Sequence, residues 1–244
     1  MLLPKTGATP GECEDAIGLD ATARRFAIAD GATEAFDARG WAERLALAWT
    51  KVDALPRVPE DFIEWACGEG AAWASVWNGR ELPWYAAEKR RAGSFAAFLG
   101  LEFTEGASGL RWRAVAVGDV CLIQVRAGAV SGALPIADWR DFNQTPRLVR
   151  SVEARSLMRE SDVIIAEGAV ENSAVFWLLS DAMAAWCLRA FAEDATRFAE
   201  FENLLLQAND ASLTKFIDEE RAALRLRDDD VAAIRIEVVS EGKS

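Results

Sequence analysis

Apolar runs and helically spaced apolar residues follow one another along this chain, and their order predicts a mixture of strands and helices. Short apolar runs at 26–29 and 175–179 predict strands, and a last strand is predicted from 231 to 239. After the first strands, two amphipathic helices are predicted by apolar residues at helical spacing: Trp41, Leu45, Trp49 and Val52, then Phe62, Ala66, Trp73 and Trp77.

The middle of the chain is predicted to be a block of antiparallel strands. A third helix is expected first, at about 83–98, because Pro83 stands near its start and Gly100 after its end. The strands expected after it lie at 102–104, 110–117, 120–126 and 129–130. From 135 to 172 regular periodicity fades, and we interpret this segment either as a substrate-selecting flap or as an ordered surface loop.

The last part of the chain returns to helices, predicted at 183–192, 195–207 and 213–226. The order of elements predicts an α+β fold, with helices on either side of antiparallel sheets. That order is strands, paired helices, a block of strands, paired helices and a final strand. No linker-like or repeated segment interrupts the chain, so we expect a single domain over 1–240 with a short tail at 241–244.

Composition narrows the classes of partner. The chain has 244 residues, is 51% hydrophobic and carries a net charge of −12, so it can bury a large core but would repel a nucleic-acid backbone. It lacks a signal peptide and a membrane-spanning stretch, which predicts a cytoplasmic protein with no membrane partner. Its four scattered cysteines predict neither a zinc site nor disulfides, and its ten tryptophans are expected to pack helices onto sheets.

The candidate chemistry lies in acidic residues at the edges of the predicted strands. Because the chain contains no histidine, any catalysis must use carboxylates. The acidic elements are Glu14-Asp15, Asp30-Gly31, Gly118-Asp119, Ser180-Asp181 and Asp228-Asp229-Asp230.

Four of these five elements have a structural alternative when they are taken alone. Asp30-Gly31 could be a hairpin turn, although the following residues lead into a helix, or Asp30 could cap that helix. Ser180-Asp181 could be a helix N-cap, Gly118-Asp119 a tight turn, and the acidic run at 228–230 a solvated turn.

Their joint occurrence favours a shared site. Carboxylates that are distant in sequence can converge at one edge of a sheet sandwich when each ends or begins a strand. Clustered carboxylates raise one another's pKa unless cations neutralise them, so the set predicts hard divalent ions with oxygen ligands. Mg²⁺ or Mn²⁺ fits this donor set better than zinc, which prefers histidine and cysteine.

Read in order, the elements resemble the metal-dependent protein phosphatases, the PPM or type 2C serine/threonine family. The resembling positions are Glu14 to Ala16, Asp30-Gly31, Gly118-Asp119, Ser180-Asp181 and Asp229-Asp230. The resemblance implies a four-layer α-β-β-α sandwich with two antiparallel sheets flanked by helix pairs. It also implies hydrolysis of phosphoserine and phosphothreonine in proteins by water that two Mg²⁺ or Mn²⁺ ions activate.

The resemblance further assigns roles to residues. It implies that Asp30 bridges two ions, that the Gly31 carbonyl binds one of them, and that Asp181 and Asp229 bind the other. Asp15 would act through bound water. Asp119 matches the position that, together with Asp181, holds a third ion in some members.

Three positions depart from the family pattern. Pro10 stands where an arginine usually grips the substrate phosphate, and Lys5 is the residue that could replace it. Ala32 stands where many members have a histidine, and Ala182 where glycine is common. These departures motivate an alternative, a pseudophosphatase that acts as a regulatory binding module.

Overall fold

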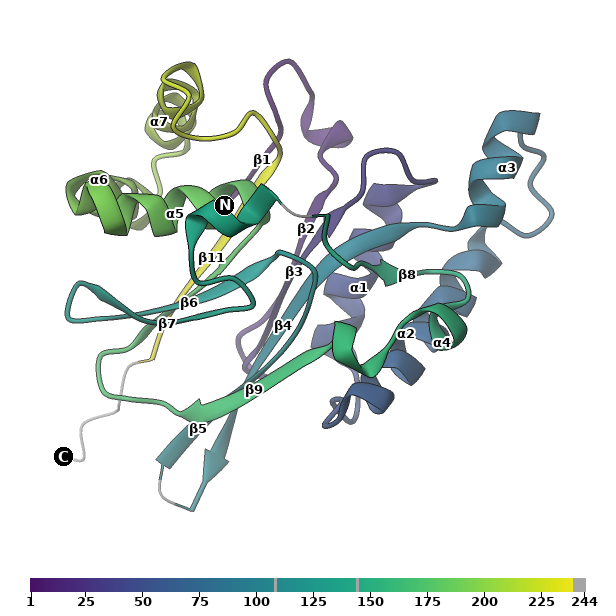
Figure 1. Cartoon of the computed structure of the whole chain (residues 1–244), viewed down its shortest axis with the longest axis horizontal. Helices are drawn as coiled ribbons and strands as arrows, with labels where there is room; N and C mark the ends of the chain where they lie inside the picture. The colour runs from purple at the N-terminus through teal and green to yellow at the C-terminus, as the bar shows by residue number, and fades with distance from the viewer. Residues whose placement is uncertain (108, 144, 239–244) are drawn as a thin grey trace.

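Two antiparallel β-sheets lie face to face, and helices cover the outer face of each (Figure 1). The computed structural model describes residues 1–107, 109–143 and 145–238. The predicted α+β fold, a four-layer α-β-β-α sandwich, is therefore confirmed. The predicted tail at 241–244 lies outside the described residues, and the single domain over 1–240 stays a prediction.

One sheet has six strands and the other has five. The strands of the six-stranded sheet are β2 (Asp15–Asp20), β3 (Arg25–Gly31), β4 (Phe95–Gly106), β5 (Gly109–Val117), β8 (Val149–Arg150) and β9 (Ile164–Ala169). They pair in the order β2-β3-β4-β5-β9, with β8 beside β4. The strands of the five-stranded sheet are β1 (Leu2–Leu3), β6 (Cys121–Arg126), β7 (Ala129–Leu134), β10 (Val175–Leu179) and β11 (Val231–Glu237). Their order is β1-β11-β10-β6-β7.

The helices fall into groups along the chain. They are α1 (Ala38–Lys51), α2 (Pro59–Val76), α3 (Trp84–Ala92), α4 (Ala154–Leu157), α5 (Asp181–Glu193), α6 (Ala195–Leu206) and α7 (Asp210–Ala222). Short 3-10 turns occur at Pro10–Glu12, Trp139–Asn143 and Glu160–Asp162. The helices α1 and α2 pack on the six-stranded sheet, whereas α5, α6 and α7 contribute to the core over the five-stranded sheet.

Alternating residues of each central strand enter two different cores. In β3, Phe26 and Ile28 lie in the core between the sheets, whereas Ala27 and Ala29 lie in the core beneath α1. The small alanines leave room for α1, whose Trp49 is buried against the sheet. Because both faces of β3 are covered, its sequence is continuously apolar rather than alternating.

Most of the tryptophans pack as predicted, but one does not. Trp41, Trp49 and Trp177 are fully buried. Trp84, at the start of α3, is 79% exposed, so the expectation of core packing is wrong for this residue.

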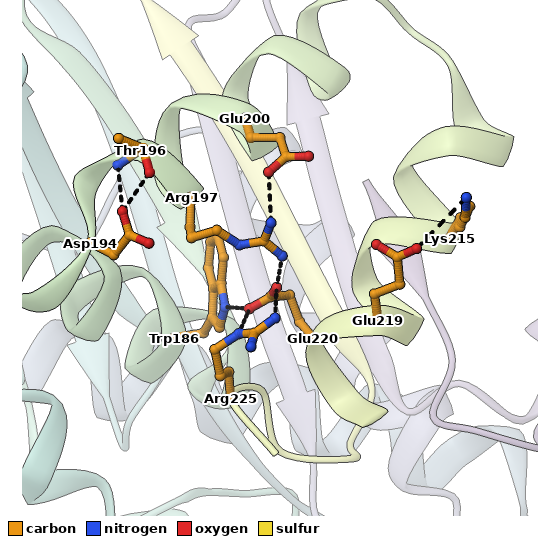
Figure 2. Close-up of polar contacts among 9 residues, drawn as sticks. All are labelled: Trp186, Asp194, Thr196, Arg197, Glu200, Lys215, Glu219, Glu220 and Arg225. Atoms are coloured by element: carbon orange, nitrogen blue, oxygen red, sulfur yellow. Dashed lines mark hydrogen bonds and ion pairs between the residues drawn. The ribbon is translucent and has the colours of Figure 1, made fainter. Parts of the chain in front are cut away.

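A buried carboxylate joins the three helices over the five-stranded sheet. Glu220 of α7 is fully buried, and its carboxylate accepts hydrogen bonds from Trp186 of α5 and Arg197 of α6 (Figure 2). Arg225, just after α7, donates two further bonds of 2.8 and 2.7 Å to the same carboxylate. Glu220 is thus a polar link between α5, α6 and α7.

The predicted helix at 83–98 is wrong in its second half. α3 ends at Ala92, and Phe95 already belongs to β4. The stop is Gly93, which has a φ of +86°, a left-handed conformation that ends helices and that glycine adopts without strain.

The expectation of an irregular segment from 135 to 172 is also wrong in part. The segment contains α4, and β8 and β9 complete the six-stranded sheet. β9 pairs with β5 at the edge of the sheet, where its exposed side chains leave little apolar pattern to detect.

Candidate active site

Asp15 and Asp30 lie directly opposite each other on the antiparallel strands β2 and β3. The Gly31 N–H donates a 3.1 Å hydrogen bond to the Glu14 carbonyl, which fixes this end of the strand pair. A Cβ on Gly31 would lie 2.7 Å from the Ala38 carbonyl oxygen, so only glycine lets α1 start this close. The paired carboxylates are therefore held where α1 begins.

Neither local alternative for Asp30 applies. β3 leads to α1 rather than to a partner strand across a tight turn, so Asp30-Gly31 is not a hairpin turn. α1 begins at Ala38 with Asp37 as its N-cap residue, so Asp30 does not cap the helix.

Asp119 lies where the chain crosses from one sheet to the other. The crossing joins Val117 at the end of β5 to Cys121 at the start of β6. Gly118 turns the chain with a φ of +93°, and a Cβ on it would lie 2.6 Å from the Ala97 Cβ. The tight-turn alternative therefore describes the backbone correctly, and the turn brings a buried Asp119 to the edge shared by the two sheets.

Ser180 and Asp181 connect β10 to α5. The Ser180 hydroxyl accepts a 2.9 Å hydrogen bond from the Ala232 N–H of β11 and makes no capping bond to α5. Ser180 is the N-cap residue by position, but its side chain binds the neighbouring strand. Asp181, at the first turn of α5, is 8% exposed.

The acidic run before β11 divides into two kinds of residue. Asp230 is buried and accepts hydrogen bonds from the N–H groups of Lys5 and Glu14, at 2.8 and 2.7 Å, so it anchors the N-terminal segment. Asp229 is partly exposed, and its carboxylate pairs with Arg227. The solvated-turn alternative is therefore wrong for Asp230.

The segments that carry Asp30, Asp119 and Asp181 border one cavity of about 400 Å³. Asp30, Asp119 and Asp181 line it from three different parts of the chain. The rest of the described lining is Ala32, Ala97, Phe142, Thr145, Pro146, Leu148 and Arg227. Four of these residues come from the 135–172 segment, which therefore borders the cavity, and its role as a substrate-selecting flap stays a prediction.

Burial and mutual repulsion oppose ionisation of the carboxyl groups. Burial, and then the charges of Asp15 and Asp181, raise the pKa of Asp30 well above its usual range. The pKa of Asp15 is also raised well above its usual range, mainly by burial. Burial and then the charge of Asp181 raise the pKa of Asp119 to about 6. These carboxyl groups thus lie close enough to raise one another's pKa, and a bound cation would neutralise that repulsion.

Arg227 is a candidate functional residue that the sequence analysis missed. Its guanidinium donates to the carboxylates of Asp181 and Asp229, in the latter case at 2.9 Å, and its side chain is half exposed. Nothing in the local sequence distinguishes Arg227 from the other dispersed arginines. Only the folded chain shows that it bridges two of the predicted metal ligands.

The donor chemistry of the site fits a hard divalent cation. All the side-chain donors are carboxylate oxygens, and the Asp15 Oδ2 atom is buried without a hydrogen-bond partner. Within the described residues, no group of three or more His, Cys, Asp or Glu side chains is arranged to hold a metal ion as it stands. The Arg227 guanidinium, which pairs with Asp181 and Asp229, would compete with a cation for these two carboxylates.

Lys5, the predicted phosphate ligand, does not line this cavity. Its ammonium group lies 3.8 Å from the Glu14 carboxylate, and Lys5 lines another cavity beside α7. Pro10 opens a short 3-10 turn, and its carbonyl accepts a 3.3 Å hydrogen bond from Arg39 of α1. The role proposed for Lys5 stays a prediction. Among the described residues that line the cavity, Arg227 is the one with a positively charged side chain.

Comparison with known proteins identifies the fold. No protein-family model matches the chain, and no curated protein matches it. The solved structures that it resembles include the catalytic domain of the serine/threonine phosphatase PstP in complex with two manganese ions, with a TM-score of 0.61 and 14% identity over 98% of this chain and 97% of that one. They also include the photosystem II phosphatase PBCP, with a TM-score of 0.60 and 13% identity over 98% and 97% of the two chains. A third is the PPM Ser-Thr phosphatase MsPP from Mycobacterium smegmatis in complex with cacodylate, with a TM-score of 0.53 and 12% identity over 98% and 97%.

These likenesses extend over nearly the whole length of each chain, and they show that this chain has the fold of the PPM-type serine/threonine phosphatases. Among the described residues, no helix combines the length and apolar character needed to cross a membrane.

Proposed function

We propose that this protein is a Mg²⁺- or Mn²⁺-dependent phosphatase that removes phosphate from serine and threonine side chains of proteins. The observation that carries the proposal is the meeting of Asp30, Asp119 and Asp181 at one cavity, beside a buried Asp15 with an unpartnered oxygen. The full-length likeness to PPM phosphatases, one of them in complex with two manganese ions, supports it.

The residues that would hold the ions follow from the proposed site. Two ions would be held by Asp15, Asp30, the Gly31 carbonyl, Asp181 and Asp229, and a third by Asp119 together with Asp181. When bound, Mg²⁺ or Mn²⁺ supplies an acidified water and neutralises the charge of the phosphoryl group.

The protein's own residues prepare the site for this chemistry. Gly31 and Gly118 allow the close backbone approaches that place Asp30 and Asp119. The carboxyl groups of Asp15, Asp119 and Asp181 are buried, so they gain more from binding a cation than solvated carboxylates would.

Arg227 is the residue that would bind the substrate phosphate in place of the arginine that Pro10 replaces. The Arg227 guanidinium donates to one oxygen of Asp181 and one of Asp229, and its positive charge would repel a cation bound to the same carboxylates. Ion binding would thus free the guanidinium, which lines the same cavity and whose planar donors match phosphate oxygens.

Hydrolysis of p-nitrophenyl phosphate and of a phosphothreonine peptide tests the proposal. We expect activity with Mn²⁺ that chelation abolishes and that Asp30→Asn lowers by at least about a hundredfold, because this substitution removes a shared ligand. Asp53→Asn, on an exposed loop, is the matched control and should retain activity. Activity that survives both chelation and Asp30→Asn would refute the metal-dependent mechanism.

The regulatory alternative predicts that the protein binds manganese but does not hydrolyse phosphate esters. The Pro10 and Ala32 positions and the Arg227 bridge are the observations that favour it. Manganese binding by calorimetry without turnover on a broad phosphopeptide panel would support a binding module. Clear turnover would exclude it.

A further inference from the structure

The helix α3 extends away from the body of the molecule, beyond the end of α2 (Figure 1). None of its nine residues, Trp84–Ala92, is buried. A helix this short is not stable through propensity alone, so its ends must be fixed by the flanking chain. Pro83 presets the first turn, and the Gly93 N–H donates to the carbonyls of Lys89 and Arg90 at the last turn. The helix is thus held by its ends, and its side chains face solvent.

Two large aromatic side chains lie at the free end of α3. Trp84 is 79% exposed and Tyr85 is 58% exposed, and their ring centroids are 6.0 Å apart in an edge-on arrangement. Other tryptophans of this chain, such as Trp41 and Trp177, are fully buried. Exposed tryptophan and tyrosine are the residue types that most often anchor a protein partner.

The other end of α3 is basic, in a chain whose net charge is −12. The last turn carries Lys89, Arg90 and Arg91, against the single acidic residue Glu88 in the helix. Lys89 lies 3.6 Å from Glu34, whose side chain is 97% exposed, and such a solvated pair is weak. Arg91 forms no ion pair with any residue that the structure describes. Arg90 donates a 3.2 Å hydrogen bond to Asn78, whose side chain is neutral, so the charges of all three basic residues are available to an anionic partner.

The basic end of α3 adjoins the candidate active site. From Gly93 the chain enters β4, whose Ala97 lines the cavity. The Phe95 carbonyl accepts a 2.9 Å hydrogen bond from the Ala32 N–H, directly after Asp30-Gly31.

Two further arginines lie in the segment that follows Thr145 and borders the cavity. Arg150 of β8 is paired with Phe95, and its guanidinium lies 4.6 Å from the Phe95 ring centroid. Arg147 is exposed and stands between Pro146 and Leu148, which both line the cavity. Arg147 is therefore adjacent in sequence to residues that line the cavity, and Arg150 contacts Phe95, two residues after Gly93.

We propose that α3 is a docking arm for an acidic stretch of the phosphoprotein substrate. Trp84 and Tyr85 bind an apolar side chain of that stretch, and Lys89, Arg90 and Arg91 bind its carboxylates. The proposal rests on the phosphatase function proposed above, and it names the substrate class of that site. It answers an electrostatic need, because a chain with a charge of −12 otherwise repels a phosphorylated, acidic protein.

Charge reversal and aromatic truncation on α3 test the docking arm. The variants are Lys89→Glu/Arg91→Glu and Trp84→Ala/Tyr85→Ala, all at exposed positions where folding should be preserved. The matched control is Lys215→Glu on α7, where the side chain is 78% exposed. Each protein is assayed with Mn²⁺ on an acid-flanked phosphothreonine peptide, a base-flanked peptide and p-nitrophenyl phosphate.

The measured quantity is the kcat/KM for the acid-flanked peptide divided by that for p-nitrophenyl phosphate. We expect both α3 variants to lower this ratio about tenfold, mainly through KM, and the effect of charge reversal to fade at high salt. The Lys215→Glu ratio should stay within about twofold of the wild type, because an isolated exposed charge has little effect. Equal ratios in the wild type and in both α3 variants would overturn the proposal.

A binding measurement separates failure of the docking arm from failure of the phosphatase function. Fluorescence anisotropy of a labelled acidic phosphopeptide is measured in chelator, where no turnover is needed. Peptide binding that the α3 variants weaken supports docking even if no variant or wild-type protein shows turnover. Turnover without α3-dependent peptide binding refutes docking alone. Stronger α3-dependent binding to anionic phosphatidylserine vesicles than to the peptide would also refute it, since it would identify a membrane surface as the partner.

Discussion

Asp30 combines the two properties that define the site at the scale of a residue, burial and proximity to other carboxylates. Both raise its pKa, so the ionised side chain lowers the stability of the metal-free fold. Residues kept in an unfavourable state in this way are typical of functional sites. A bound cation would offset this loss of stability by neutralising the charge of the carboxylate.

Asp30→Asn should therefore stabilise the metal-free protein. A group whose folded pKa is raised adds stability below its unfolded pKa and loses that stability as the pH rises through the folded pKa. We expect the metal-free wild type to melt at a higher temperature at pH 5.5 than at pH 7.5, and Asp30→Asn to reduce this difference. Manganese should raise the melting temperature of the wild type but not of Asp30→Asn.

The outcome that contradicts this account is a metal-free wild type whose melting temperature is the same at both pH values. Asp53→Asn, at an exposed position, is the control and should behave as the wild type does.

Arg227 should compete with cations for Asp181 and Asp229. Arg227→Gln removes the competing guanidinium, and since that guanidinium is half exposed and its pairs are weakened by solvent, we expect manganese to bind about two- to fivefold more tightly. The same variant should raise KM for phosphate esters, because the cavity loses the guanidinium that would bind the phosphate. Calorimetry and steady-state kinetics measure the two effects. Weaker manganese binding in Arg227→Gln would contradict the competition.

At the scale of the element, the ends of strands and helices carry the functional information. The apolar runs of β3 and β10 predicted buried strands correctly, because strands covered on both faces need apolar residues throughout. The start of β4 was assigned to a helix, because Ala96 and Phe98 suit either structure and only the left-handed Gly93 separates them. Pairing with β3 and β5 decided the outcome, and no local pattern contains that information.

The Glu220 cluster allows a test of how the helices are held together. Burial raises the pKa of Glu220, but hydrogen bonds from Arg225 and Arg197 lower it more, to about 2 in total. A lowered folded pKa adds stability above the unfolded value of about 4.3, and this stability is lost as the pH falls toward 2. We expect Glu220→Gln to reduce the free energy of unfolding by about 2 to 3 kcal/mol at pH 7.

Denaturant unfolding at pH 7 and at pH 3 measures this effect. The difference between Glu220→Gln and the wild type should shrink at pH 3. Glu219→Gln is the matched control, because Glu219 is half exposed on the same helix and pairs only weakly with Lys215 (Figure 2). An equal loss in both variants would show that the buried cluster has no special role.

At the scale of the whole molecule, the sandwich brings distant connections to one edge. The order of elements predicted helices on either side of antiparallel sheets, and the family resemblance added the four layers. The positions of Asp30, Asp119 and Asp181 at strand ends, together with that resemblance, led us to expect them at one edge, and they line one cavity. Arg227 and the exposed α3 could not be predicted, since each depends on which surfaces remain uncovered after folding. The similarity to PPM phosphatases at 12–14% identity is consistent with this difference between fold and surface, because the fold is retained while most side chains differ.

The central claim is that Asp30, Asp181 and Asp229 share divalent cations. Crystals soaked in manganese chloride and measured at the manganese absorption edge test it most directly. The account predicts anomalous peaks at the carboxylates of Asp30, Asp181 and Asp229, with the Arg227 guanidinium moved away from Asp181. Peaks absent from this cavity at saturating manganese, with Arg227 still bridging Asp181 and Asp229, would contradict it.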